Sequence, residues 1–250
     1  MPVMIDVPII FPADARPTYN FGSIMHGMLM EKFNASEKES FHLQRLKPFS
    51  QHIRVDGEKN AVWRVCGLTE SVEKRLKEIV AIDFDKKQWF LKQKGYEIKC
   101  GGGIKVFEKT YAQIAEECFV KNCFSKKIKL RIRTPMGFKK DGNYVIFPSI
   151  ELIIKSLYSK WDAFSKGLSL EGKEICEELC ANTFLTGYTL KSTRFSLEGT
   201  SVASFVGTLE ITQSGPDALI RLTRMLFEYS KFCGIGIKTA LGMGGVEVNE

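Results

Sequence analysis

The sequence predicts an α+β protein in which two units with the same order of elements, βαββαβ, follow one another along 250 residues. Two observations predict this fold. Short stretches with alternating apolar residues, typical of strands, are separated by stretches with helical spacing, and the order occurs twice. Five glycines also gather in 233–245, between an amphipathic stretch and a short alternating tail. Glycine lets another backbone or a ligand approach closely, so this loop is expected to serve contact.

Bulk properties favour an anionic partner and exclude several classes of protein. The net charge is +7 and the pI is near 9.0, which places nucleic acid first among possible partners. Seven cysteines form no Cys-x-x-Cys pair, and with only three histidines no familiar zinc spacing occurs. No apolar run approaches the about 18 residues that span a bilayer. We therefore expect a reduced, cytoplasmic protein that has no structural metal, no cofactor and no membrane segment.

The first unit is predicted over residues 1–118. Residues 3–11 are predicted to form a first strand, and Pro8 favours a sheet edge or a bulge. Apolar residues at helical spacing predict a helix at 20–33 with Asn20 as a possible cap, and a loop that carries His42 follows. The remaining elements are a hairpin, an amphipathic helix and two strands interrupted by glycines, over 51–55 with 61–68, 71–80, 87–92 and 96–108.

The second unit is predicted over residues 125–250, after a connector at 110–125 for which a helical turn is one alternative. Residues 127–133 alternate strictly, and Pro148 precedes a run of apolar residues at helical spacing. A second helical stretch, a long hairpin that turns at Glu198, an amphipathic helix and the tail follow at 172–181, 184–197 with 200–212, 216–231 and 246–250. This order is that of the ferredoxin-like (RRM-like) unit. The predicted fold is two such domains in tandem.

The glycine-rich loop, residues 233–245, is a candidate phosphate site. Backbone N–H groups exposed by glycines, with a lysine beside them, suit a phosphate. The loop is neither a P-loop nor a dinucleotide fingerprint, because Lys238 follows Ile237 and Thr239 stands where a third glycine belongs. A phosphate chain is therefore favoured over a mononucleotide. The predicted contacts are Lys238, Gly234, Gly236, Gly242 and Gly244.

A basic strand face is a second candidate for binding nucleic acid. Lys129, Arg131 and Arg133 alternate with apolar residues and so share one face of the strand at 127–133. A solvated sheet face explains the same pattern equally well. Lys139, Lys140, Lys191 and Arg194 rank lower as extensions of this basic surface.

Three segments carry a resemblance to a known family. They are Gly234-Ile-Gly-Ile-Lys238-Thr-Ala-Leu-Gly242-Met-Gly244-Gly-Val-Glu-Val, the stretch Lys129-Leu-Arg-Ile-Arg-Thr-Pro-Met-Gly-Phe138 with Pro148 and Ser156-Leu-Tyr-Ser-Lys-Trp161, and the histidine segment from Phe41-His42 to Lys47. Together they resemble CRISPR-associated endoribonucleases of the Cas-six type, members of the RAMP superfamily that cut precursor CRISPR RNA within each repeat. The resemblance implies the tandem ferredoxin-like fold.

The resemblance also implies metal-independent cleavage, in which the RNA 2′-OH attacks the adjacent phosphate and leaves a 2′,3′-cyclic phosphate and a 5′-OH. Histidines suit the proton transfers and a lysine suits the developing charge. His42 matches the family's histidine segment, although a solvated loop histidine is the alternative. His26 lies on the first helix, where a histidine packed at the rim of the core is equally consistent. Lys47 is the expected cation, and His52 is expected to point outward without a role.

Two further functions compete with this interpretation. A non-catalytic subunit that holds CRISPR repeat RNA in an effector complex would keep the glycine loop and the basic face but would not need the histidine pair. An enzyme that acts on a small metabolite is not supported, because the sequence has no nucleotide motif, no Ser/His/Asp arrangement and no metal-ligand spacing. The expected partners are repeat RNA, effector-complex subunits and a second copy of the chain, and no membrane.

Overall fold

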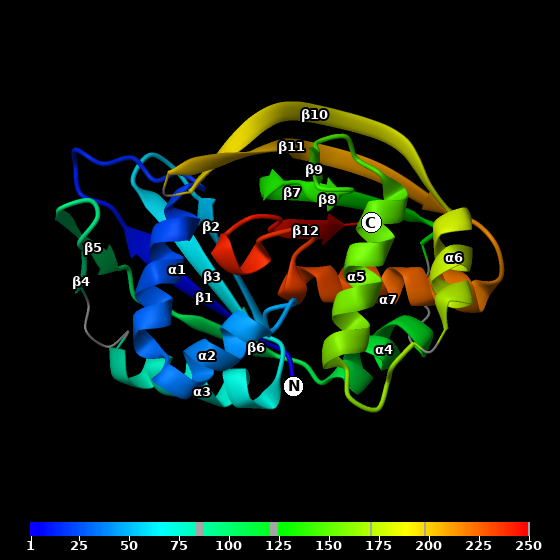
Figure 1. Cartoon of the computed structure of the whole chain (residues 1–250), viewed down its shortest axis with the longest axis horizontal. Coiled ribbons are helices and arrows are strands. Elements are labelled where there is room, and N and C mark those ends of the chain that lie inside the picture. The colour runs from blue at the N-terminus through cyan, green and yellow to red at the C-terminus, as the bar shows by residue number, and fades with distance from the viewer. Residues whose placement is uncertain (84–87, 121–124, 171, 198, 250) are drawn as a thin grey trace.

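The computed structural model describes residues 1–83, 88–120, 125–170, 172–197 and 199–249, and Figure 1 shows two sheets side by side, each with its own helices. The first residue of the strand predicted at 87–92, residues 121–124 of the connector, Glu198 of the predicted turn and the last residue of the tail lie outside the described residues. The predicted domain boundaries at 118 and 125 stay a prediction.

The N-terminal half forms one antiparallel sheet covered by helices. Its elements are β1 (Val3–Ile10), α1 (Phe21–Lys32), α2 (Ala35–Leu43), β2 (Phe49–Val55), β3 (Asn60–Gly67), α3 (Glu70–Asp83), β4 (Gln88–Leu91), β5 (Tyr96–Cys100) and β6 (Lys105–Glu108). The strand order is β2-β3-β1, with β6 on the far side of β1, and β5 with β4 continue beyond it. Strands β2, β3, β1 and β6 therefore have the ferredoxin-like order.

The C-terminal half repeats this arrangement. Its elements are α4 (Tyr111–Phe119), β7 (Lys127–Met136), β8 (Phe138–Lys140), β9 (Asn143–Val145), α5 (Ile150–Phe164), α6 (Lys173–Ala181), β10 (Thr183–Leu197), β11 (Thr200–Gln213), α7 (Asp217–Cys233), the 3-10 helix η1 (Thr239–Leu241) and β12 (Val246–Asn249). The sheet order β10-β11-β7-β12 again places the first strand of the unit between the third and the fourth. The predicted tandem ferredoxin-like fold is confirmed.

Helix α2 lies where the sequence predicted a loop, and α4 is longer than the helical turn considered for the connector. Helix α2 begins with a reciprocal capping box, in which Asn34 Oδ1 accepts from Glu37 N at 2.9 Å and Glu37 Oε2 accepts from Asn34 N at 2.7 Å. Thr110 and Gln113 form the same motif ahead of α4. Such a box satisfies the free N–H groups of a first turn, so it starts a helix even where the apolar pattern is weak. His42 therefore lies in the last turn of a helix rather than in a loop.

Other sequence predictions on the N-terminal half also need correction. Pro8 lies in a central strand, not at a sheet edge, because the partner of β1 changes there from β6 to β5 and Gly101 N donates to the Pro8 carbonyl at 2.8 Å. Asn20 is the N-cap residue of α1, but its side chain makes no capping hydrogen bond; its Oδ1 accepts from Ser196 N at 3.0 Å and joins α1 to the β10–β11 hairpin. His52 does not point outward, since it is 6% exposed and lies against Gly245.

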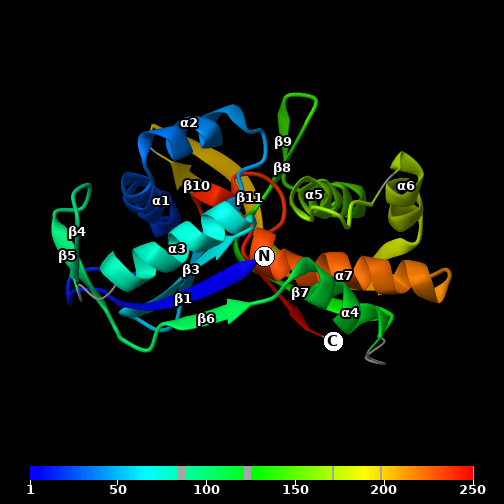
Figure 2. The ribbon, with the colours of Figure 1, turned by 90° about the horizontal axis from the view of Figure 1, so that it is seen from below.

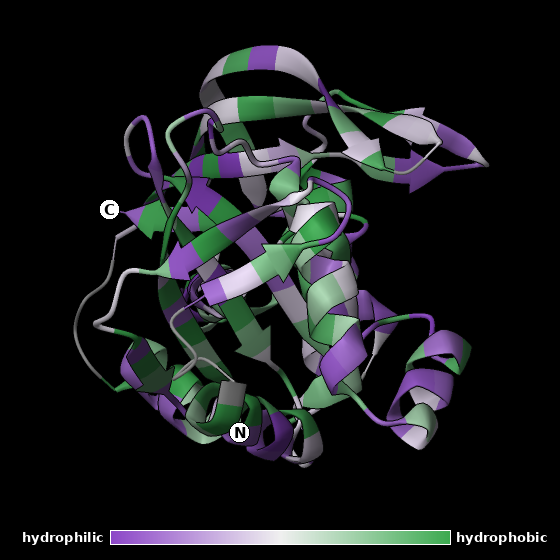
Figure 3. Cartoon of the chain, turned by 90° about the vertical axis from the view of Figure 1, so that its left-hand side faces the viewer, coloured by the Kyte–Doolittle hydropathy of each residue, from purple (hydrophilic) through white to green (hydrophobic). Residues whose placement is uncertain are grey.

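The two halves share a core rather than only a linker. Met4, Cys66 and Leu68 of the N-terminal half belong to the large apolar cluster of the C-terminal half. Ser50 Oγ donates to the carbonyl of Phe232 at 2.5 Å, and η1 packs on β2. Figure 2 shows α1 and α2 on one side of the loop after α7 and α5 on the other, and Figure 3 shows hydrophilic and hydrophobic residues alternating along the strands. This shared core fixes how α1 and α2 face α5.

Within the described ranges, no helix is long and apolar enough to cross a membrane.

Candidate active site

A cavity of about 700 Å³ lies between the two halves. Both halves contribute to its wall: helices α1 and α2 and the segment after them from the first, and the β8–β9 hairpin, α5 and the glycine-rich loop from the second. The residues with polar or charged side chains in this wall are His26, His42, Arg45, Lys47, Lys139, Tyr144, Lys155, Ser156, Ser159, Lys160, Lys238 and Thr239. The sequence-predicted residues His26, His42, Lys47, Lys238 and Gly236 therefore meet at one place.

His26 and His42 reach this cavity from different helices. The His26 ring stacks on Phe49 with the ring centroids 5.9 Å apart. Burial lowers the pKa of His26 below its ordinary 6.5; a hydrogen bond to the Ala240 backbone raises it, and the charges of Lys47 and His42 lower it further. His26 Nδ1 is buried with no hydrogen-bond partner among the described residues. His26 is thus neutral near pH 7, whereas His42 is exposed in the last turn of α2.

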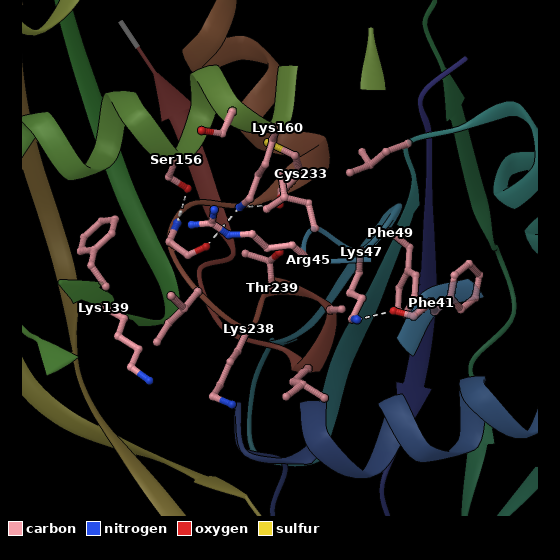
Figure 4. Close-up of a pocket in the computed structure, with 18 of the residues that line it drawn as sticks. Phe41, Arg45, Lys47, Phe49, Lys139, Ser156, Lys160, Cys233, Lys238 and Thr239 are labelled. Carbon is pink, nitrogen blue, oxygen red and sulfur yellow. Dashed lines mark hydrogen bonds between the residues drawn. The ribbon is translucent and has the colours of Figure 1, made fainter. Parts of the chain in front are cut away.

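Lys47 lies beside these histidines but is held by the backbone. Its Nζ donates to the carbonyl of Phe41 and, at 2.8 Å, to that of Gln44, and so satisfies carbonyls at the C-terminal end of α2 (Figure 4). A cation there also interacts favourably with the helix dipole. This geometry gives Lys47 a structural role, because it holds the turn that carries His42.

Arg45 is a cavity residue that the sequence interpretation did not select. Its side chain extends into the cavity in Figure 4, and no ion pair restrains it within the described part of the chain. Lys238 and Lys139 line the same cavity from the glycine loop and from β8. Three cations from three elements therefore surround one space. The short spacing from His42 to Arg45 was the only signal in the sequence that could have indicated this role.

Lys160 organises the glycine-rich loop from inside the protein. It is 5% exposed, and its Nζ donates to the carbonyls of Cys233, Gly234 and Gly236 at 3.3, 2.9 and 3.2 Å. Burial lowers the pKa of Lys160 to about 8. Sequence reasoning missed it, although it follows Ile153 by two helical turns and so lies on the buried face of α5.

The backbone of the glycine-rich loop is mostly buried and bonded within the protein, contrary to the expectation of exposed N–H groups. Gly234 N donates to Ser230 O, Gly236 N to Ser156 Oγ and Gly244 N to Pro135 O, each at 2.9 Å. These glycines serve close packing instead. A Cβ at Gly242 would lie 2.7 Å from the Cα of Gly22 in α1, and one at Gly236 would lie 2.4 Å from the Gly137 carbonyl.

The basic strand face is separate from the cavity. Ile128, Leu130 and Ile132 of β7 point into the core beneath the helices, so Lys129, Arg131 and Arg133 point to the opposite side of the sheet. Arg133 forms an ion pair with Glu247 at 2.6 Å, and Arg54 approaches the same carboxylate at 3.5 Å. Lys129, Arg131 and Arg133 do not line the cavity.

This arrangement joins a neutral, partly buried histidine, an exposed histidine and several cations in one open cavity. Such a set suits transfer of protons around a phosphate ester, because imidazoles exchange protons near neutral pH and cations stabilise negative charge on phosphate oxygens. No group of three or more His, Cys, Asp or Glu side chains that could hold a metal occurs among the described residues.

Comparison with known proteins finds similarity to one family of endoribonucleases. The family "CRISPR-associated endoribonuclease Cas6" matches residues 130–246. The chain is 27% identical over 242 residues to the CRISPR-associated endoribonuclease Cas6 of Streptococcus thermophilus, covering 94% of each chain. It is 24% identical to that of Mycobacterium tuberculosis, covering 95% of this chain and 74% of the relative.

Solved structures extend the similarity to the fold. A Cas6 product complex superposes with a TM-score of 0.80 at 20% identity over 100% of both chains. A Thermus thermophilus Cas6 gives a TM-score of 0.72 at 17% identity, covering 100% of this chain and 98% of the other. The similarity in sequence covers nearly the whole chain, the similarity in fold covers all of it, and both are to Cas6 endoribonucleases.

Proposed function

We propose that this chain is an endoribonuclease that cuts precursor CRISPR RNA within its repeats without a metal ion, leaving 2′,3′-cyclic phosphate and 5′-OH ends. The observation that carries the proposal is the meeting of His26 and His42 in one cavity that is also lined by Arg45 and Lys238. The similarity to Cas6 endoribonucleases supports the choice of RNA as substrate.

The two histidines take different roles because their surroundings differ. Neutral His26 accepts the proton of the 2′-OH, and the resulting oxygen attacks the adjacent phosphorus. His42, as an imidazolium, gives its proton to the 5′-oxygen as the P–O5′ bond breaks. Burial supports the assignment of His26 as the base, since its lowered pKa keeps the imidazole unprotonated near neutral pH.

Cations stabilise the negative charge of the pentacoordinate phosphorus. Arg45 and Lys238 line the cavity, and no ion pair restrains either of them among the described residues, so both are available to the phosphate. Lys47 adds positive charge next to His26 while it holds the end of α2. We assign a second RNA contact to Lys129, Arg131 and Arg133. These residues lie on the face of the sheet that points away from the cavity.

The test is cleavage of the host's own repeat RNA in excess EDTA. Wild type is compared with His26→Ala, His42→Ala, the double variant and Glu39→Ala, a control on α2 outside the cavity wall. A single cut that resists EDTA and slows at least about 100-fold in each histidine variant, but not in the control, supports the mechanism.

Two further measurements make the result specific. An RNA with a 2′-deoxy nucleotide on the 5′ side of the cut should bind but stay intact, because the attacking hydroxyl is absent. Treatment of the product with acid should convert a cyclic phosphate into a monophosphate. Tight binding without any cut by the wild type would contradict the nuclease and leave the RNA-holding subunit as the function.

A further inference from the structure

We propose that three exposed aromatic side chains beside the cavity, Tyr144, Phe147 and Tyr188, form a stacking platform for unpaired nucleotides that flank the cut. The inference rests on the proposed function for the identity of the ligand as RNA. It assigns to this surface a role that the acid–base residues do not perform, namely to hold single-stranded RNA by its bases.

The platform is built from two segments far apart in the sequence. Phe147 follows the β8–β9 hairpin, and Tyr188 lies on β10, the edge strand of its sheet. Their ring centroids are 6.4 Å apart with the ring planes at 81°, so one ring meets the other with its edge. Phe147 is 62% exposed and Tyr188 58% exposed. An edge-to-face pair leaves ring faces open, and an open face is what a base stacks on.

Tyr144 connects the platform to the cavity. It is 46% exposed, lines the cavity, and pairs across the hairpin with Lys139, which lines the same cavity. Phe147 lies three residues further along the chain, and Figure 1 shows the β8–β9 hairpin against the β10–β11 strands. An RNA strand that leaves the cavity past Lys139 therefore meets Tyr144 first and the Phe147–Tyr188 pair next.

The charge around the platform fits a polyanion. Lys139 and Lys140 are exposed on β8, in the hairpin that precedes Phe147. Asp141, at the turn of the hairpin, is the acidic residue of that segment. Aromatic rings interleaved with lysines are typical of single-stranded nucleic-acid grooves, where lysines follow the phosphates and rings take the bases. Single exposed aromatic residues are ordinary on protein surfaces, but three together beside a basic cavity are not.

The test uses 2-aminopurine, whose fluorescence falls when it stacks, placed in the unpaired flank of a repeat RNA. The double variant Phe147→Ala/Tyr188→Ala is compared with wild type and with Phe90→Ala/Phe107→Ala, a control pair of exposed aromatic residues on β4 and β6 of the N-terminal half. We expect fluorescence quenching by wild type and the control, and its loss in the platform variant. The Kd of the flanked RNA should rise at least about tenfold, with the RNA that lacks the flanks unaffected.

The outcomes separate this inference from the proposed function. Tyr188→Phe should bind as wild type, because stacking needs the ring and not the hydroxyl. If wild type cuts the RNA and the platform variant binds flanked RNA as tightly as wild type, the platform is wrong and the nuclease stands; a partner protein is then the better occupant. If wild type quenches the probe, the platform variant does not, and wild type cuts nothing, the nuclease is wrong and the platform stands.

Discussion

Replacement of Lys160 by methionine tests whether the buried ammonium organises the glycine-rich loop. Methionine keeps an unbranched apolar stem but lacks the ammonium group, so it removes the N–H donors from the carbonyls of Cys233, Gly234 and Gly236. Each buried acceptor left without its donor costs about 1–3 kcal/mol. The substitution also removes the cost of burying the charge: the lowering of the pKa from 10.5 to about 8 corresponds to about 3 kcal/mol. Three such acceptors cost about 3–9 kcal/mol together, and relief of the charge burial offsets about 3 kcal/mol of this, so the net expectation is a loss of roughly 3 kcal/mol in the free energy of unfolding.

Urea denaturation at pH 7 measures this loss, with Lys166→Met, an exposed lysine near the end of α5, as the control. RNA affinity should fall further in Lys160→Met than in the control, because Lys238 lies on the loop that Lys160 holds. The reasoning is refuted if Lys160→Met unfolds at the same urea concentration as wild type and binds repeat RNA equally well. A variant that is less stable but binds normally would limit the role of Lys160 to stability.

Three further predictions follow from burial, packing and charge. Gly242→Ala should lower the free energy of unfolding by about 2–4 kcal/mol, since its φ of 112° and its contact with α1 exclude a side chain, whereas Gly27→Ala, which meets open space, should not. Burial lowers the pKa of His52 to about 3, so as the pH falls the unfolded chain takes up a proton that the folded chain does not bind. The free energy of unfolding of wild type, measured by urea titration, should therefore fall by about 2 kcal/mol between pH 6.5 and pH 5. The variant His52→Gln should not show this loss. Cleavage should rise with pH through the lowered pKa of His26, and Lys47→Met should move that pKa upward in the pH–rate profile, because the charge of Lys47 lowers it.

Most helices and strands could be predicted from local patterns of apolar and polar residues. The strict alternation of β7 and the helical spacing of α5 and α7 follow directly from which face of each element is buried. Helix α2 was not predicted, because its sequence is polar and only Phe41 of the helix is buried, which leaves a weak periodic signal. The Asn34 and Glu37 capping box was the available signal, and it lies in the first residues of that helix.

The site was predictable only in part, because its residues meet through tertiary contacts. His42 and His26 were found through the chemistry of histidine together with the family resemblance. Arg45 and Lys160 were not found from the sequence. The role of Lys160, a lysine on an apolar helix face, can be recognised only when the carbonyls that it binds are known. In the sequence, Lys129 and Lys238 were equivalent candidates for RNA binding. The structure distinguishes them, because Lys238 lines the cavity and Lys129 lies on the opposite face of the sheet.

The contact between Gly22 and Gly242 has a consequence for how the molecule folds. It joins the first helix to the loop before the last strand, and the cavity wall needs both. Closing so long a segment of chain costs entropy that is regained only after distant elements pack, which slows folding. Each sheet is therefore expected to form ahead of the cavity, and hydrogen exchange during refolding should show the amides of η1 protected later than those of β3 or β11.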